Sequence, residues 1–176
     1  RSRVPVTIWD DRCVVESCGA DAGRWLSRYL DEPCHLVRMP DSTHRAIEQS
    51  RAGEGGRVSL ADAFPLLAVS EASLAALNAR LDAPLPMNRF RPNLVVAGVG
   101  PHEEDEWDTV RIGPIAMVAA KPCERCVITT IDQDTASAGI EPLRTLALYR
   151  RGKAGVLFGQ SDTGEIPRPR LPEPVE

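Results

Sequence analysis

The first forty residues alternate hydrophobic and polar positions and then change to a helical spacing. Every second residue is apolar at Val4, Val6 and Ile8, which predicts a strand with one buried face. Residues 13–16 are expected to return as the second strand of a hairpin. Asp21 then predicts the N-cap of a helix whose apolar residues share one side: Trp25, Leu26, Tyr29 and Leu30. A further strand is expected over residues 35–39.

The rest of the chain contains more strand patterns and two further helices. Ser70 is expected to cap a helix over residues 71–81, with three leucines on a shared face. Pro142 predicts the start of a helix over residues 143–151. Strands are expected at five more places: 66–69, 94–99, 110–112, 115–119 and the β-branched run that begins at Val127.

Composition and charge restrict the classes of function. The 176 residues can bury the core of one domain, or of a domain plus a partial one. A net charge of −4 makes nucleic acid an unfavourable partner, and the acidic run 103–106 predicts a solvated loop. No apolar stretch reaches bilayer length, and no signal peptide is expected. The five cysteines form an odd set, which predicts free thiols in a reducing cytoplasm.

Two cysteines lie three residues apart in the segment Lys121-Pro122-Cys123-Glu124-Arg125-Cys126. Thiolates bind soft metals and act as nucleophiles, and neighbouring cations favour their formation. The segment is therefore a candidate thiolate site, with a buried structural cysteine as the alternative for Cys126. A thioredoxin-like disulfide motif is disfavoured, because the pair is expected to precede a strand and not to open a helix.

A second candidate segment runs from Asn88 to Val96. Pro92 has a fixed φ and is expected to hold Arg91 in an extended conformation, so that Arg91 and Asn93 form a stiff corner. The guanidinium offers a planar fork of donors for phosphate or ring heteroatoms, and the amide adds a donor and an acceptor. The alternative is an arginine–carboxylate pair that only holds a turn.

Several ordered motifs make the chain resemble a known family. They are Phe90-Arg91-Pro92-Asn93, Glu104-Asp105-Glu106-Trp107-Asp108, Arg111-Ile112-Gly113, Lys121 through Asp132, and Phe158-Gly159-Gln160. In this order they resemble the MOSC domain, the molybdenum cofactor sulfurase C-terminal domain. The chain looks most similar to the branch of the bacterial hydroxylaminopurine-detoxifying proteins and the mitochondrial amidoxime-reducing component. The resemblance covers residues 59–160 strongly and the preceding part more loosely.

The resemblance implies a site for the molybdenum cofactor (molybdopterin). Cys126 aligns with the thiolate that ligates molybdenum, and Arg125 and Lys121 would offset anionic charge around the cofactor. Arg91 and Asn93 align with residues that contact the pterin and its phosphate.

Further site residues follow from the same resemblance. Asp62 aligns with an acidic residue beside the metal, where it could relay protons or hold a water; a helix or turn cap is the alternative. Phe64 stands where the amidoxime reductases carry a small hydroxyl residue, so that contact is not carried over. Thr129 could donate its hydroxyl to the cofactor, although a β-branched residue in a strand needs no such role.

The leading hypothesis from the resemblance is an oxidoreductase that reduces small N-hydroxylated compounds. The chain has no cysteine spacing typical of an iron–sulfur cluster, so a separate ferredoxin-like protein or flavoprotein would supply electrons. A sulfur carrier with a persulfide on Cys126 is the alternative, and a cofactor-binding fragment without activity is a third. Pyridoxal phosphate binding is a further expectation from the sulfurase resemblance. Neither nucleic acid nor membrane is an expected partner.

Strand count and resemblance together predict an α+β protein, a mostly antiparallel, partly closed β-barrel of the MOSC type with about three flanking helices. Residues 1–58 are expected to be the remnant of an N-terminal MOSC-associated barrel domain with its linker, and residues 59–160 the MOSC domain. Residues 161–176 contain four prolines and predict a disordered tail in place of strands that close the barrel. Because the chain begins at Arg1 and not at Met, we expect it to be a fragment or a processed piece.

Overall fold

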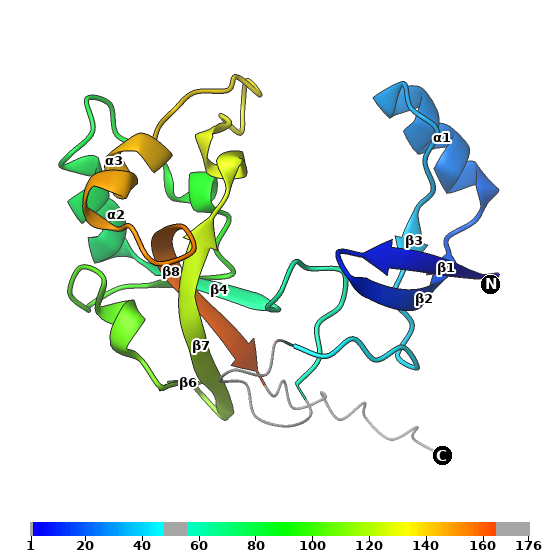
Figure 1. Ribbon diagram of the computed structural model, residues 1–176, viewed down its shortest axis with the longest axis horizontal. Helices are drawn as coiled ribbons and strands as arrows, with labels where there is room; N and C mark the ends of the chain where they lie inside the picture. The colour runs from blue at the N-terminus through cyan, green and yellow to red at the C-terminus, as the bar shows by residue number, and fades with distance from the viewer. Residues whose placement is uncertain (1, 48–55, 165–176) are drawn as a thin grey trace, which may run out of the picture. The chain divides into compact units, whose positions relative to one another are not determined.

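The computed structural model describes residues 2–47 and 56–164. The chain divides into two compact units, which we describe separately (Figure 1). Among the described residues, unit 1 is built from 2–47 and 57–63, and unit 2 from 56 and 64–164. The division therefore falls after residue 63, a few residues later than the domain boundary that the sequence predicts.

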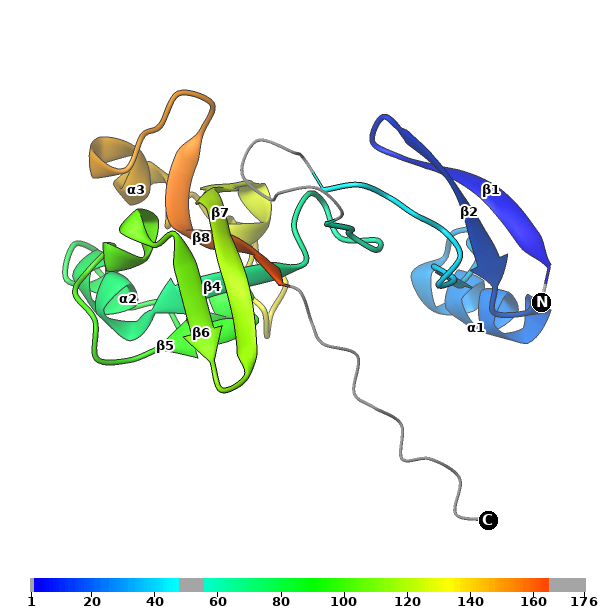
Figure 2. The same cartoon turned by 90° about the horizontal axis from the view of Figure 1, so that it is seen from below.

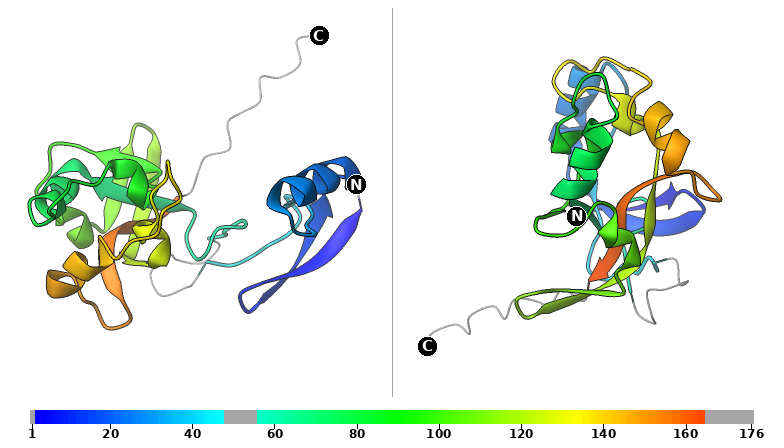
Figure 3. Two further views of the ribbon diagram at one scale, coloured as in Figure 1. Left: turned by 90° about the horizontal axis from the view of Figure 1, so that it is seen from above. Right: turned by 90° about the vertical axis from the view of Figure 1, so that its left-hand side faces the viewer.

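Unit 1 contains a β-hairpin, a short third strand and one helix (Figure 3). Strands β1 (Arg3–Ile8) and β2 (Asp11–Ser17) pair antiparallel along their whole length, as the alternation predicts. Strand β3 (Val37–Arg38) pairs antiparallel with β2 and is shorter than predicted. The side chains of Cys13 and Val15 are buried on one face of β2, so the hairpin has the expected single apolar face.

Helix α1 (Ala20–Leu30) begins two residues earlier than a cap at Asp21 would place it. The N-cap is Gly19, and Asp21 lies in the first turn, so the prediction of Asp21 as the cap is wrong. The carboxylate still favours the helix, because it lies near the positive end of the helix dipole. Trp25 and Tyr29 lie on one side as predicted, but both are exposed, and their rings stack with centroids 5.5 Å apart.

Unit 2 contains a five-stranded sheet in the order β5-β4-β8-β7-β6. Its strands are β4 (Leu66–Ser70), β5 (Leu94–Val96), β6 (Thr109–Ile112), β7 (Ile115–Arg125) and β8 (Val156–Gly164). All neighbours pair antiparallel except β4 and β5, which are parallel. The sheet is curled, and β6 and β7 cross the direction of β4 (Figure 2). The described residues thus form the predicted α+β protein, with strands predominating.

The core of unit 2 lies between the sheet and helices α2 (Glu71–Asn78) and α3 (Leu143–Tyr149), which both end slightly earlier than predicted. Its fully buried members are Val69, Leu77, Phe90, Leu146 and Phe158. Ser70 caps α2 as predicted, because its hydroxyl accepts from the Ser73 N–H at 3.0 Å. None of the helices in the described residues has the length and apolar character that a bilayer span requires.

The Phe158-Gly159-Gln160 motif serves the fold at the centre of this sheet. Phe158 packs against Phe90 with ring centroids 4.3 Å apart. Gly159 has φ of 79°, and a Cβ there would lie 2.8 Å from the Ala68 carbonyl oxygen and 2.8 Å from Val69 Cγ2. Only glycine fits such a close approach between β8 and β4. This motif therefore belongs to the packing of unit 2.

Strand β8 contradicts the prediction of a tail that begins at residue 161. Residues 161–163 are buried, and the strand pairs with β4 and β7 as far as Gly164. The segment Ser161-Asp162-Thr163 is wholly polar, so alternation of apolar residues does not predict this end of the strand. The rest of the predicted tail, 165–176, lies outside the described residues.

The acidic run is only in part the solvated loop that the sequence predicts, since Glu103 and Glu106 are exposed. Residues Glu103–Glu106 form a 3₁₀-helix, η2, and the Glu104 side chain is fully buried. Glu104 Oε1 accepts from the Ser70 N–H at 3.3 Å, at the start of α2. Asp105 also pairs with Arg150 at 2.5 Å, and Glu103 Oε2 accepts from the Gly100 N–H at 2.6 Å. Charge patterning cannot show these contacts.

Candidate functional site

Cys126 lies where β7 ends and a short 3₁₀-helix, η3 (Val127–Thr130), begins. The sequence predicts a strand after the cysteines, and this prediction is wrong. The hydroxyls of Thr129 and Thr130 donate to the carbonyl oxygens of Cys126 (3.0 Å) and Val127 (2.8 Å). Such local side-chain bonds compete with the ladder of a strand. The resulting turn leaves Cys126 exposed.

Thr129 contacts the candidate ligand residue from within the turn. Its side chain is buried, and both its N–H (3.3 Å) and its hydroxyl (3.0 Å) donate to the Cys126 carbonyl oxygen. The hydroxyl proton is therefore used inside the protein. The structure gives Thr129 the task of holding Cys126, and its direct contact with a cofactor stays a prediction.

Cys123 and Cys126 are not placed for a disulfide. The backbone between them is extended, since Cys123 lies in β7 and Cys126 has φ of −94° and ψ of 178°. At about 3.3 Å per residue, their Cα atoms are roughly 10 Å apart, whereas a disulfide needs a separation below about 7 Å. Spacing thus disfavours the thioredoxin-like reading. The argument from sequence, that a strand and not a helix follows the cysteines, does not apply, because Cys126 is the N-cap of η3.

Arg125 connects the cysteine segment to the corner at Arg91. Its Nη1 donates to Cys123 Sγ (3.2 Å), and its Nη2 donates to the carbonyl oxygen of Phe90 (2.7 Å), the residue directly before Arg91. The guanidinium carbon also lies 6.0 Å from the centre of the Phe90 ring. The two segments singled out in the sequence are therefore neighbours in space.

The backbone of the corner differs from the prediction. Arg91 follows the 3₁₀-helix η1 (Met87–Phe90) and has φ of 53° and ψ of 46°, the left-handed conformation, and not the extended one expected before Pro92. Its N–H donates to the Asn88 carbonyl oxygen (3.1 Å) and closes the turn, as a helix-ending residue does. The side chain is exposed. Among the described residues its guanidinium has no hydrogen bond or ion pair.

Asn93 fixes this corner to the sheet. Its backbone N–H donates to the Leu67 carbonyl oxygen (2.8 Å), and its side-chain Oδ1 accepts from the Leu67 N–H (2.9 Å). These two bonds precede the parallel pairing of β4 with β5. Asn93 thus has a structural role in the described contacts, and its contact with the pterin stays a prediction.

Sequence reasoning misses an ion pair beside the corner, between the buried Arg89 and the partly exposed Asp132. Arg89 Nη2 lies 2.6 Å from Asp132 Oδ2, and the Arg89 side chain is only 8% exposed. Asp132 Oδ1 accepts from the N–H groups of Asp134 (3.1 Å) and Thr135 (2.9 Å) and from the Thr135 hydroxyl (2.9 Å). The bonds from Thr135 lower the pKa of Asp132 from its ordinary 3.8. The Asp-x-x-Thr spacing signals this turn, but no local signal names Arg89 as partner.

Asp62 lies in unit 1, whereas the other five predicted site residues lie in unit 2. Its side chain is exposed, and its carbonyl oxygen accepts from Arg45 Nη2 at 2.7 Å. The buried Arg45 also pairs with Asp11 at 2.7 Å. Together these residues line an open hollow of about 450 Å³ in unit 1. The described contacts of Asp62 therefore serve unit 1, and its place beside a metal stays a prediction.

The residues around Cys126 fit an anionic, metal-bearing cofactor. Cys126 offers a thiolate, the ligand that soft metals prefer. The exposed guanidinium of Arg91 suits a phosphate group. In the part of the chain that the structure describes, the Nε atoms of Arg89 and Arg125 are buried donors without a hydrogen-bond partner. The cluster thus has more donors and positive charge than the described protein groups satisfy.

Fold and site together define an α+β protein in which the segment of an exposed cysteine lies beside the segment of an arginine corner. A comparison with protein families matches residues 55–167 to the MOSC domain. The chain belongs to the MOSC domain family, as the sequence motifs predict.

Curated relatives carry two kinds of name. The chain is 41% identical over 138 residues to mitochondrial amidoxime-reducing component 1 of Mus musculus, and 36% identical over 141 residues to that of Homo sapiens; each match covers 76% of the chain and 41% of the relative. It is 33% identical over 171 residues to the molybdenum cofactor sulfurase of Oryza sativa subsp. japonica, which covers 88% of the chain and 21% of that protein. The chain thus spans less than half the length of each relative. These names give no support to pyridoxal phosphate binding.

Proposed function

We propose that the protein binds the molybdenum cofactor and reduces N-hydroxylated compounds, with the Cys126 thiolate as metal ligand. The observation that carries this proposal is the hydrogen bond from Arg125 to Phe90, which joins the segment of the exposed Cys126 to the corner at Arg91. The Arg91 guanidinium has no partner among the described residues. Family membership and the similarity to proteins named amidoxime-reducing components support it.

Each residue of the proposed site has a separate task. Cys126 would hold the metal, and Arg91 and Arg125 would offset the negative charge of the pterin phosphate. Thr129 and Asn93 hold the two segments in place through side-chain hydrogen bonds to the backbone of Cys126 and Leu67. The bound cofactor supplies the redox chemistry of molybdenum. Asp62 is proposed as a proton relay on the family resemblance alone.

The proposed reaction needs electrons from outside the site. Reduction of an N-hydroxylated compound consumes two electrons and two protons, breaks the N–O bond, and yields water and the N–H product. We propose a separate ferredoxin-like protein or flavoprotein as donor, because the cysteine spacing is not that of an iron–sulfur protein. We also propose a cytoplasmic location on the free thiols, whereas the amidoxime-reducing relatives are named as mitochondrial.

Metal analysis of a Cys126→Ser variant tests the ligand role. Protein purified from a molybdate-replete host that makes the cofactor should contain molybdenum. The serine variant should retain about tenfold less, because a hydroxyl is a poor ligand for a soft metal. Cys123→Ser is the matched control, since it makes the same change three residues away and should keep most of the metal. A wild-type protein without molybdenum, or equal metal in wild type and Cys126→Ser, would contradict the proposal.

A sulfur carrier is the second candidate, favoured by the match to a molybdenum cofactor sulfurase over 88% of the chain. The Cys126 thiolate would attack the outer sulfur of a donor persulfide, forming a new S–S bond and releasing the donor as a thiolate. Mass spectrometry after incubation with such a donor should then show one labile extra sulfur on Cys126 and no molybdenum. Molybdenum without extra sulfur supports the reductase. A protein with neither molybdenum nor extra sulfur supports an inactive fragment.

A further inference from the structure

The ion pair between Arg89 and Asp132 connects the two halves of the proposed site. The residues are 43 positions apart, and their side chains meet at 2.6 Å. Arg89 lies in η1, two residues before Arg91, and its N–H donates to the Pro86 carbonyl oxygen at 3.1 Å. The pair therefore connects the turn that presents Arg91 with the loop that follows Cys126.

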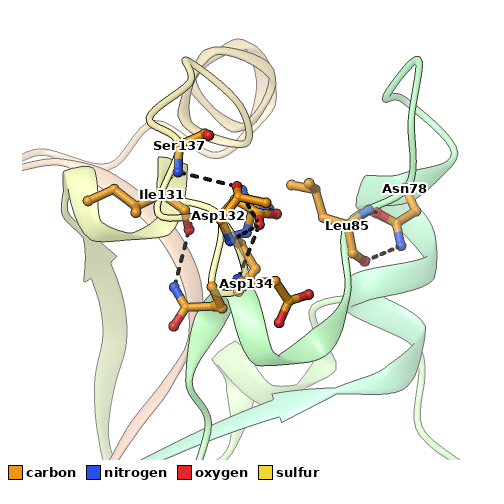
Figure 4. A network of polar contacts seen from close by, with 9 residues as sticks. Asn78, Leu85, Ile131, Asp132, Asp134 and Ser137 are labelled. Carbon is orange, nitrogen blue, oxygen red and sulfur yellow. Dashed lines mark hydrogen bonds and ion pairs between the residues drawn. The ribbon is translucent and has the colours of Figure 1, made fainter.

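Asp132 is the centre of a closed loop of hydrogen bonds (Figure 4). While Oδ2 faces Arg89, Oδ1 accepts from Asp134 and Thr135. The Asp132 N–H donates to the Ser137 carbonyl oxygen at 2.9 Å. Every polar atom of this residue is thus engaged, so the loop has little freedom to move without breaking the contact to Arg89.

The same chain of bonds continues back to the cysteine. The Ile131 N–H donates to the Ile128 carbonyl oxygen (3.2 Å), and the Thr129 N–H donates to the Cys126 carbonyl oxygen (3.3 Å). The Gly139 N–H donates to the Thr130 carbonyl oxygen (3.0 Å) and closes the loop from its other side. These bonds connect Asp132 through η3 to the backbone of Cys126.

We propose that Arg89 and Asp132 form a positioning pair that sets the distance between the Cys126 thiol and the Arg91 corner. The inference rests on the proposed function, because the pair acts through residues that would hold the cofactor. Arg125 also bridges the two segments, but it is attached before Cys126, whereas Asp132 is attached after it. The cysteine is thus fixed from both sides. Such supporting contacts to a metal site change metal affinity by about 10–100-fold when removed.

Two substitutions remove the contact, and one keeps it. Asp132→Asn and Arg89→Gln each abolish the ion pair. Arg89→Lys retains a cation for the single contact to Oδ2 and should behave almost as wild type. Asp105→Asn is the matched control, because the Arg150–Asp105 pair of unit 2 is also largely buried, with side chains 14% and 19% exposed.

The first readout uses the protein without cofactor. Hydrogen exchange at the Thr129 and Ile131 amides, followed by peptide mass spectrometry, should accelerate about tenfold or more in Asp132→Asn and Arg89→Gln. Neither exchange rate should change in Asp105→Asn, even if its unfolding midpoint falls by as much as that of the two ion-pair variants. Arg89→Lys should restore both rates.

The second readout is molybdenum retained after purification, which should fall about tenfold in the two ion-pair variants and stay unchanged in Asp105→Asn. If wild type holds no molybdenum, the proposed function fails, while the exchange rates still decide the positioning role. If wild type holds the metal and the two variants match Asp105→Asn in every readout, the positioning role is wrong and the function stands.

If Asp132→Asn and Arg89→Gln fail to fold, the Arg89→Lys variant decides. Exchange rates and metal content equal to those of wild type support the positioning pair, and faster exchange with unchanged metal content overturns it.

Discussion

Asp162 is fully buried in β8, opposite Leu66 of β4 and Ala119 of β7. Among the described residues neither of its carboxylate oxygens has a hydrogen-bond partner. Burial therefore raises the pKa of Asp162 from 3.8 to about 7. The folded-state pKa of Asp162 exceeds the unfolded one. The stability that the protonated carboxyl group contributes is therefore fully present below pH 3.8 and is lost as the pH rises through about 7.

An Asp162→Asn substitution should remove this pH dependence. Because the variant has no ionisable group at the site, we expect unit 2 to gain on the order of 3 kcal/mol at pH 8 and little at pH 4. Urea unfolding at both pH values measures the effect. Asp82→Asn, at an exposed position, is the control and should change neither value. An unchanged difference in stability between pH 4 and pH 8 in Asp162→Asn would show that the carboxyl group is solvated or paired.

At the scale of elements, the spacing of apolar residues predicts the strands and helices that bury one apolar face. The alternation at β1, the buried strand β4 and the Ser70 cap of α2 are visible in the sequence and present in the structure. The turn at η3 is not predicted, because β-branched residues favour strands until the hydroxyls of Thr129 and Thr130 bond to local carbonyl groups. The whole of β8 (Val156–Gly164) is missed, and its end could not be found from apolar residues, because residues 161–163 are buried but polar.

Gly159→Ala should destabilise unit 2 by about 2–4 kcal/mol, for two reasons. The residue has a positive φ that alanine disfavours, and the new Cβ would lie 2.8 Å from the Ala68 carbonyl oxygen of β4. Gly113→Ala is the matched control: its φ is 57°, but a Cβ there meets nothing within 4 Å. The control should therefore cost only about 1 kcal/mol from the backbone conformation. Chemical unfolding of both variants measures the difference. Equal costs would mean that β8 shifts freely away from β4.

At the scale of the whole molecule, the candidate site is only partly visible in the sequence. The motifs single out Cys126 and Arg91, and the structure brings their segments together through Arg125 and Phe90. The pairing of Arg89 with Asp132 is not predictable from spacing, because it joins residues 43 positions apart in two loops without periodicity. Contacts of this kind depend on the completed sheet, which places η1 and η3 side by side.

The two units have cores of different size, which should make them unfold separately. In the described part of unit 1 the buried apolar residues are Cys13, Val15, Ile47 and Val58, whereas unit 2 buries two phenylalanines, two leucines and several smaller side chains. Since stability grows with buried apolar area, unit 1 should unfold at lower urea concentration.

Paired core substitutions test this separation. Val15→Ala removes buried methyl groups from unit 1, and Val69→Ala makes the same change in unit 2. Each should cost about 1–3 kcal/mol. Hydrogen exchange of β2 and β8 amides across a urea series should show Val15→Ala shifting only β2, and Val69→Ala only β8. If each substitution shifted both strands equally, the two cores would unfold as one cooperative structure, and the division of the chain into two units would have no thermodynamic meaning.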